Sequence, residues 1–323
     1  MRLTDAFEAA ESAESAILRM ARSEQFTGTF LWADSKMAER HGDRKMERIE
    51  YSRMVKLCGV EKEEVERNIA QILEQLRLKA EKKQEEQEAG TEGKDKENSI
   101  EAEGRTRELP KVSINSLPGE IHVKVSALGT DEKEARKAVK PVVRELKARL
   151  GDAVYSTEED TTLEQAAVEL LMANGLTVTC AESCTGGMLS ARLINVAGVS
   201  ECYKCGFITY SNKAKRKLLG VKKGTLHKYG AVSAQTAEEM ARGAALRFQS
   251  DVAVSVTGIA GPDGGTEEKP VGLVYIGCCV KGQVTVKECH FEGDRQEVRA
   301  QSVTEALVLM RSCILAACGQ DKA

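Results

Sequence analysis

One stretch decides the fold of this 323-residue chain, because a strand pattern in it runs directly into a glycine-rich turn. The strand is Leu176-Thr177-Val178-Thr179-Cys180, and the turn is Ala181-Glu182-Ser183-Cys184-Thr185-Gly186-Gly187. A helix pattern resumes at Met188. A strand, a tight turn and a helix in direct succession are typical of a layered α/β domain.

The same alternation extends over residues 161–318. Thr162 and Gln165 form a capping-box pair before the first helix, and Gly175 ends that helix. Further strands are predicted at 206–210, 252–256, 273–280 and 284–291, and further helices at 212–219, 234–248 and 294–317. The fold class is therefore α/β, with a layered α/β/α domain around a mixed sheet.

A smaller α+β domain is predicted in front of it, over residues 111–160. Residues 120–126 alternate like a half-buried strand, and Asp131 with Glu134 predicts the start of a capped helix. Pro141 lies inside that helix pattern and is expected to kink or divide it. A short strand at 153–155 completes the domain.

The N-terminal quarter predicts helix and then a linker. Four apolar residues recur at spacings of four, three and four, which marks one helix face: Val65, Ile69, Ile72 and Leu76. Residues 46–57 carry a weaker version of this pattern, so residues 1–81 are interpreted as a helical segment of unknown role. Residues 82–110 are interpreted as a charged flexible linker, because 82–109 hold nine acidic and six basic residues and very few apolar ones.

The composition argues against several classes of partner. The chain has 47 basic and 50 acidic residues, so its formal net charge is −3, and only 4% of its residues are aromatic. These values disfavour a dedicated binder of nucleic acid or of an anionic membrane. No apolar run approaches the roughly 20 residues of a membrane span, and the N-terminus lacks the apolar core of a signal peptide. A cytoplasmic protein is expected.

The ten cysteines favour buried thiols over disulfides. Nine of them lie between Cys180 and Cys318, and a reducing compartment keeps such residues free. Cys202 and Cys205 form a Cys-x-x-Cys pair, but a structural zinc site requires a second spaced pair, which the chain does not provide. The four histidines are scattered and none repeats at metal-ligand spacing. No metal and no cofactor are expected.

Catalytic chemistry is expected at the turn that follows the decisive strand. Ser183 is the natural nucleophile, and the residues Thr185, Gly186 and Gly187 allow backbone N–H groups to approach an oxyanion. A simple helix cap is the alternative interpretation. Lys215 belongs to a basic cluster after the next strand and is a candidate base, because burial and neighbouring cations lower a lysine pKa. A solvated basic helix face is the alternative there.

A second glycine-rich turn is a candidate wall for a ligand. It follows the strand at 252–256 and contains Thr257, Gly258, Gly261 and Gly264. Arg295, at the start of the last helix, is available for a phosphate, although Asp294 and Glu297 in the same turn also read as a simple capping box.

Five motifs in this order resemble the C-terminal domain of the competence-damage-inducible CinA family. They are 181–187, 209–212 with Lys215, 230–233, 257–265 and 293–295. That domain is the nicotinamide-mononucleotide deamidase, PncC. Residues 111–160 resemble the small KH-like connecting domain of full-length CinA proteins. Nothing in residues 1–109 resembles the molybdopterin-binding-like domain with which those proteins begin.

The resemblance implies hydrolysis of the carboxamide of nicotinamide mononucleotide to nicotinate mononucleotide and ammonia, in pyridine-nucleotide salvage. It places the catalytic serine, tyrosine and lysine at Ser183, Tyr210 and Lys215, and it leaves open whether Tyr210 or Lys215 is the base. Cys184 is a rival nucleophile because thiolates are more reactive than hydroxyls. A protein that binds the nucleotide without turnover is the alternative function, and a homo-oligomer is plausible.

Overall fold

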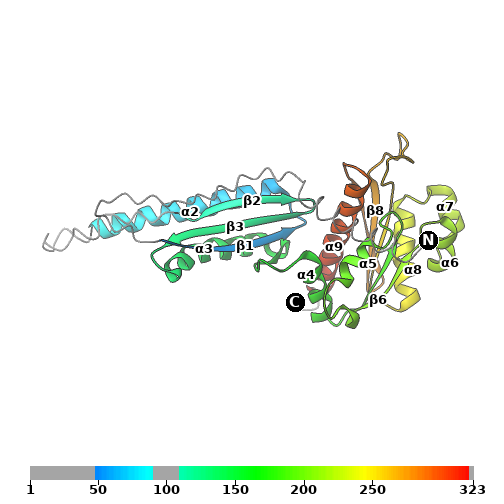
Figure 1. The fold of residues 1–323 in the computed structure, drawn as a ribbon, viewed down its shortest axis with the longest axis horizontal. Coiled ribbons are helices and arrows are strands. Elements are labelled where there is room, and N and C mark those ends of the chain that lie inside the picture. Colours follow the sequence, from blue (N-terminus) through cyan, green and yellow to red (C-terminus); the bar gives the residue numbers. More distant parts are fainter. Residues whose placement is uncertain (1–47, 90–108, 320–323) are drawn as a thin grey trace, which may run out of the picture. The chain divides into compact units, whose positions relative to one another are not determined.

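The structure is a computed structural model that describes residues 48–89 and 109–319 (Figure 1). All of these residues belong to one compact unit, Met46–Ala323. The helical segment predicted for residues 1–47 and most of the predicted linker lie outside the described residues.

A five-stranded mixed sheet forms the centre of the C-terminal domain. Its strand order is β6-β5-β7-β8-β9. The first three strands, β6 (Tyr203–Ile208), β5 (Val178–Glu182) and β7 (Val252–Gly258), are parallel. The last two, β8 (Leu273–Val280) and β9 (Gln283–His290), are antiparallel to their neighbours. The predicted mixed sheet is therefore confirmed, with β5 in the decisive stretch.

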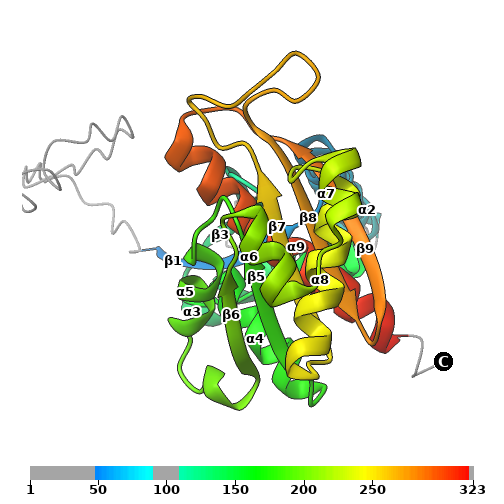
Figure 2. The same ribbon diagram turned by 90° about the vertical axis from the view of Figure 1, so that its right-hand side faces the viewer.

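Helices cover both faces of this sheet (Figure 2). On one face, α4 (Leu163–Ala173), α5 (Met188–Ile194) and α9 (Arg295–Gly319) contribute to a large aliphatic core with β5, β7 and β8. On the other face, α8 (Ala234–Phe248) packs on β5, β7 and β8. The short helices α6 (Asn212–Leu219) and α7 (Lys223–Tyr229) pack against α8. The predicted α/β/α layering is confirmed.

Helix α9 is the one described helix whose length and composition would allow it to cross a membrane. Ten of its residues are buried within the fold, where it contacts α4, β7 and β8. A core helix of an α/β domain is apolar for this reason.

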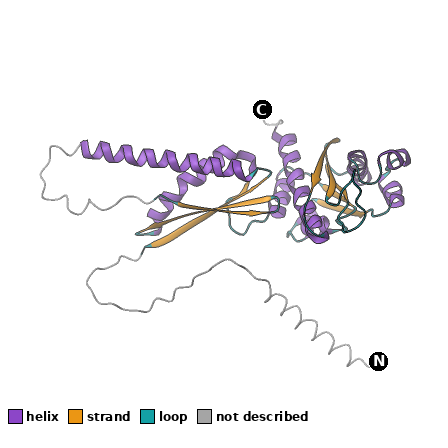
Figure 3. Cartoon of the chain, turned by 90° about the horizontal axis from the view of Figure 1, so that it is seen from above, coloured by secondary structure: helices purple, strands orange, loops and turns teal. Residues whose placement is uncertain are grey.

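The smaller domain has the order β-α-β-β-α-β. Its elements are β1 (Ile49–Cys58), α2 (Lys62–Ala89), β2 (Lys111–Leu117), β3 (Glu120–Gly129), α3 (Glu132–Leu150) and β4 (Val154–Ser156). The strands pair antiparallel in the order β2-β3-β1-β4, which is the split β-α-β arrangement of ferredoxin-like domains. Helices α2 and α3 lie along one face of the sheet (Figure 3).

This domain begins earlier than the sequence predicted. The helix expected at 46–57 is wrong, because β1 pairs over its whole length with β3 and buries Val55 and Leu57 at the two-residue period of a strand. The helix predicted from Val65 is present, but α2 continues to Ala89, through the first part of the predicted linker. The boundaries at 81 and 110 are therefore wrong, since β1 and α2 complete the sheet and core of the small domain.

Pro141 does not divide α3. The helix runs without interruption from Glu132 to Leu150. Its apolar face is fully buried on the sheet on both sides of the proline, at Val139, Val142 and Leu146. This packing outweighs the loss of one backbone hydrogen bond.

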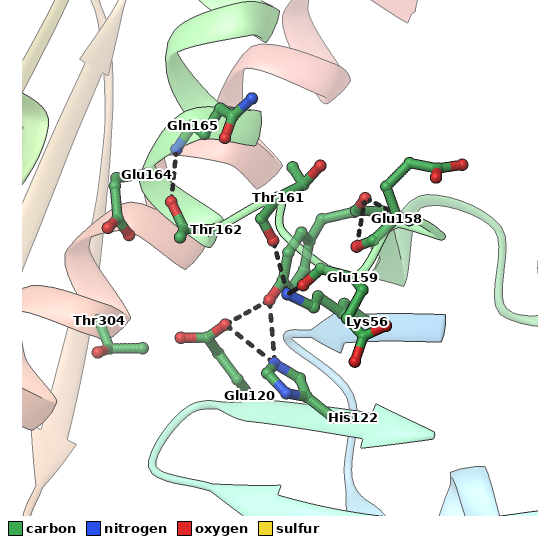
Figure 4. A network of polar contacts seen from close by, with 12 residues as sticks. Lys56, Glu120, His122, Glu158, Glu159, Thr161, Thr162, Glu164, Gln165 and Thr304 are labelled. Atoms are coloured by element: carbon green, nitrogen blue, oxygen red, sulfur yellow. Dashed lines mark hydrogen bonds and ion pairs between the residues drawn. The ribbon is translucent and has the colours of Figure 1, made fainter. Parts of the chain in front are cut away.

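A buried polar network joins the two domains (Figure 4). The Glu120 carboxylate accepts hydrogen bonds from the Tyr155 hydroxyl at 2.5 Å and from Arg192 at 3.3 Å. Arg192 lies on α5 and also contacts Glu164 at 2.8 Å. The buried Lys56 ammonium donates to the carbonyls of Glu159 and Thr161 in the connecting segment. Strand β1 therefore fixes both the small domain and the segment that leads to the C-terminal domain.

Leu57→Ala is expected to lower the free energy of unfolding by about 2–5 kcal/mol, because the Leu57 side chain is 0% exposed in β1. Urea unfolding of the whole chain measures this. The matched control is Ile49→Ala on the same strand, whose side chain is 47% exposed and whose loss should change stability by less than about 1 kcal/mol. Equal effects of the two substitutions would contradict the assignment of β1 to the core.

Candidate active site

Ser183 lies directly after the carboxyl end of β5, in the turn that the sequence singled out. Its side chain is 8% exposed, and its backbone N–H donates to the Val256 carbonyl at 2.9 Å, which extends the β5–β7 pairing by one residue. Gly187, with a φ of 101°, then reverses the chain into α5. A left-handed φ of this kind favours glycine. The fold thus holds the Ser183 hydroxyl at the edge of the sheet where ligands of α/β proteins bind.

Lys215 contacts this serine directly. It lies on α6, which begins at the capping residue Ser211, and its side chain is 1% exposed. The Lys215 Nζ donates to Ser183 Oγ at 2.8 Å and to the Thr209 carbonyl at 2.8 Å. The two residues are 32 positions apart in sequence, and parallel pairing of β5 with β6 brings them together. The interpretation of Lys215 as part of a solvated helix face is therefore wrong.

Burial lowers the pKa of Lys215 from 10.5 to about 8. The sequence argument invoked neighbouring cations as well, but the structural cause is burial, which penalises the charged ammonium. Among the residues that the structure describes, no carboxylate pairs with Lys215. A lysine with this pKa is partly neutral near pH 7–8, and its lone pair can then accept the proton of the Ser183 hydroxyl.

Tyr210 is placed differently from this pair. Its side chain is 68% exposed, and no hydrogen bond of its hydroxyl is found in the described part of the chain. The backbone of its neighbour Thr209 is what contacts Lys215. The geometry therefore favours Lys215 as the base, and a catalytic role of Tyr210 stays a prediction.

Glu182 has a structural role that the sequence analysis missed. Its fully buried carboxylate accepts four hydrogen bonds, from the backbone N–H groups of Gly187, Leu189 and Ser190 and from the Ser190 hydroxyl. An anion at this place satisfies the free N–H groups of α5 and its dipole. The signal in the sequence was an acidic residue just before the glycine pair that opens a helix.

The hydrogen bonds to Glu182 reduce the number of backbone N–H groups that are free for the predicted oxyanion site. The Gly187 N–H donates to Glu182 at 2.9 Å and is not free to meet a substrate, contrary to the expectation for the whole 185–187 turn. Within the described residues, no acceptor is found for the backbone N–H of Gly186. The Thr185 hydroxyl oxygen is fully buried and also has no partner there. Gly186 and Thr185 remain the candidates for contact with an oxyanion.

Two arginines on α9 hold the two glycine-rich turns. Arg299 donates to the carbonyls of Cys184 and Thr185, both at 3.0 Å. Arg295, one helical turn earlier, donates to the Gly261 carbonyl at 2.6 Å. The sequence analysis found Arg295 but missed Arg299, although the spacing of four places both on one face of a helix.

The residues predicted in the second turn have mixed roles. Thr257 is buried and donates its hydroxyl proton to the Ala231 carbonyl at 2.8 Å. A Cβ at Gly258 would lie 2.5 Å from the Val274 side chain, so close strand packing requires this glycine. Gly261 and Arg295 line a cavity of about 290 Å³, together with Val271 and other residues of the two loops. Gly264 lies further along this loop, exposed to solvent.

The cysteines near the site are buried thiols. Burial raises the pKa of Cys184 to about 11, so its thiol stays protonated near neutral pH and is disfavoured as a nucleophile. All ten cysteines are free. Around Cys202 and Cys205, as elsewhere in the described residues, no three metal-binding side chains gather at one place.

Comparison with known protein families assigns both domains. The family model described as the CinA C-terminal domain matches residues 160–314, and the model described as the damage-inducible protein CinA KH domain matches residues 100–156. The chain belongs to the CinA family. The KH model thus covers the second half of the small domain, to which the structure adds β1 and α2.

The chain matches only part of the length of its relatives. A protein of Clostridium novyi, a competence-damage inducible protein by name, is 50% identical over 202 residues, which is 62% of this chain and 49% of the relative. A CinA-like protein of Dictyoglomus thermophilum is 44% identical over 211 residues, or 65% of this chain and 51% of the relative. The chain therefore covers about half the length of these CinA relatives.

Solved structures match the C-terminal domain. The crystal structure of competence/damage inducible protein CihA from Agrobacterium tumefaciens is 44% identical and covers 46% of this chain and 92% of that one, with a TM-score of 0.46. A CinA superfamily protein of Escherichia coli is 37% identical and covers 51% of this chain and 98% of that one, with a TM-score of 0.45.

Glu182→Ala is expected to lower the free energy of unfolding by about 3 kcal/mol or more, because it leaves buried donors without an acceptor. Chemical denaturation monitored by circular dichroism measures this. Glu201→Ala, an exposed glutamate of the same domain, is the control and should shift stability by about 0.5 kcal/mol at most. A small effect at Glu182 would mean that its carboxylate does not support α5.

Proposed function

We propose that this chain hydrolyses the carboxamide of nicotinamide mononucleotide to nicotinate mononucleotide and ammonia. The observation that carries the proposal is the buried contact between Lys215 Nζ and Ser183 Oγ at 2.8 Å. A buried serine beside a lysine of lowered pKa is the arrangement of a nucleophile with its general base. The choice of substrate rests on the resemblance to the CinA deamidase domain.

The proposed reaction proceeds in two halves. Neutral Lys215 takes the Ser183 proton as Oγ attacks the amide carbon, and the resulting ammonium gives a proton to the departing nitrogen, so that ammonia leaves and a Ser183 ester remains. Water then attacks the ester with Lys215 again as base, and the Ser183 hydroxyl is restored as the acid is released. One water is consumed for each ammonia formed.

Backbone and arginine groups support this chemistry. The Gly186 N–H and the Thr185 hydroxyl are proposed to stabilise the oxyanion, and Arg299 holds the turn that carries them. Arg295 is proposed to contact the substrate phosphate from the wall of the 290 Å³ cavity, since Gly261 occupies only part of its five N–H donors. The chemistry proposed here needs no metal and no cofactor.

We also propose where in the cell the reaction takes place. Ten free cysteines suit a reducing compartment, and we place the reaction in the cytoplasm. A homo-oligomer stays a prediction.

Purified protein is expected to release ammonia from nicotinamide mononucleotide, and Ser183→Ala should reduce this rate by about 1,000-fold or more. The matched control is Cys184→Ala, which should retain activity within about tenfold because the buried thiol takes no part. Loss of activity in Cys184→Ala with retention in Ser183→Ala would reverse the assignment. Calorimetric binding of the mononucleotide without ammonia release would favour the alternative of a non-catalytic binding protein.

Activity is expected to rise with pH through an apparent pKa of about 8, because Lys215 must be neutral to act as the base.

The free energy of unfolding should also depend on the protonation of Lys215. Since the folded-state pKa lies below 10.5, the unfolded chain binds more protons between these values, and wild-type stability increases there with pH.

The Tm of Lys215→Met relative to wild type should therefore be higher at about pH 7 than at about pH 9.5. Thermal scans at both values measure this difference. The control is Lys213→Met on the exposed face of α6, whose difference from wild type should not change with pH in this way. A pH-independent difference for Lys215→Met would contradict a buried lysine of lowered pKa.

A further inference from the structure

A second cavity, far in sequence from the active site, lies in the small domain between α3 and β1. Its volume is about 670 Å³, which is within the range of small-molecule sites. It forms because β4 pairs with β1 only at Lys56 and Leu57, so the first half of β1 has no neighbour on that side. Nothing in the proposed amide hydrolysis uses this cavity.

The cavity combines an apolar floor with a cationic rim. Tyr51 and Val143 supply aromatic and apolar surface. Tyr51 lies on the helix-covered face of β1, because it alternates in register with Val55 and Leu57. The Arg53 Nε donates to the Tyr51 hydroxyl at 2.9 Å and so presents a guanidinium beside the ring.

Four further cations line the cavity from α3: Arg136, Lys140, Arg144 and Lys147. Their spacings of four, four and three place them along one side of the helix, over roughly 16 Å. Two acidic residues stand near this set, since Glu158 pairs with Arg53 at 2.9 Å and Glu145 lies 3.6 Å from Arg144. In the described part of the chain, Arg136, Lys140 and Lys147 form no ion pair.

This row of like charges does not serve the fold. Cations four residues apart on a helix repel each other, and the core of the domain is made by a different, apolar face of α3. A bound anion would remove the repulsion and form charge-assisted hydrogen bonds. The arrangement thus fits a ligand with several negative charges and a flat apolar part.

We propose that this cavity binds a nucleotide with two or more phosphates, with the phosphates on the cations of α3 and Arg53 and the base against Tyr51 and Val143. The cavity offers one aromatic ring, whereas sites for single-stranded nucleic acid stack successive bases on several. A mononucleotide therefore fits this site better than a polymer. The site is separate from the active site and does not depend on the proposed amide hydrolysis.

Isothermal titration of the whole chain with ATP tests the proposal. Binding in the micromolar range is expected, and Lys140→Gln with Arg144→Gln should weaken it by about tenfold or more. The matched control removes two charges from α3 outside the cavity, Lys133→Gln with Lys137→Gln, and should bind ATP within about threefold of wild type. Circular dichroism checks that both double variants remain folded.

Four outcomes would overturn the proposal. They are no binding of ATP up to about 1 mM at low salt, equal weakening by the two double variants, binding of inorganic tripolyphosphate as tight as that of ATP, and tighter binding of a ten-nucleotide oligothymidylate than of ATP. Equally tight binding of tripolyphosphate would mean that the cavity is a site for inorganic anions. Tighter binding of the oligothymidylate would mean that it is part of a nucleic-acid surface. Ammonia release is not measured in this experiment, so failure of the amide hydrolysis would leave its result unaffected.

Discussion

The contact between Lys215 and Ser183 is the interaction on which the proposed function depends, and it exists because the fold removes a lysine from water. Burial disfavours the ammonium and brings its pKa to about 8, while the Thr209 carbonyl and Ser183 Oγ, each 2.8 Å away, keep the nitrogen in place. An exposed lysine would be charged at neutral pH and could not accept a proton. The same burial that would let Lys215 act as a base therefore works against stability, and the apolar packing of α6 on α8 has to offset it.

The rest of the site consists largely of backbone groups held by buried charges. Glu182 occupies the N–H groups at the start of α5, and Arg299 occupies the carbonyls of Cys184 and Thr185. Both charges come from elements of the rigid core, so the turn that carries Ser183 is fixed on two sides. Fixed dipoles stabilise developing charge without having to reorient, which is the advantage of such a site over water.

The small domain is joined to this site through α5. Arg192 on that helix contacts Glu120 of β3 and Glu164 of α4, and Lys56 of β1 fixes the connecting segment. The small domain also carries the cationic cavity on the side of α3 and β1, for which we propose a nucleotide as ligand.

The sequence by itself determined the layered α/β class, a strand predicted at 176–180 and found at 178–182, the capped helices and the identity of Ser183 and Lys215 as candidates, because these follow from local periodicity and motif spacing. It could not determine the strand at 49–58, because β1 pairs with β3 some 70 residues away and its burial does not alternate: its first residues are exposed and its last four are all buried. Tertiary structure alone decided that Lys215 is buried, that Glu182 and Arg299 hold the turn around Ser183 and that Tyr210 faces solvent. Burial and hydrogen bonding arise from residues distant in the chain, so no local pattern carries them.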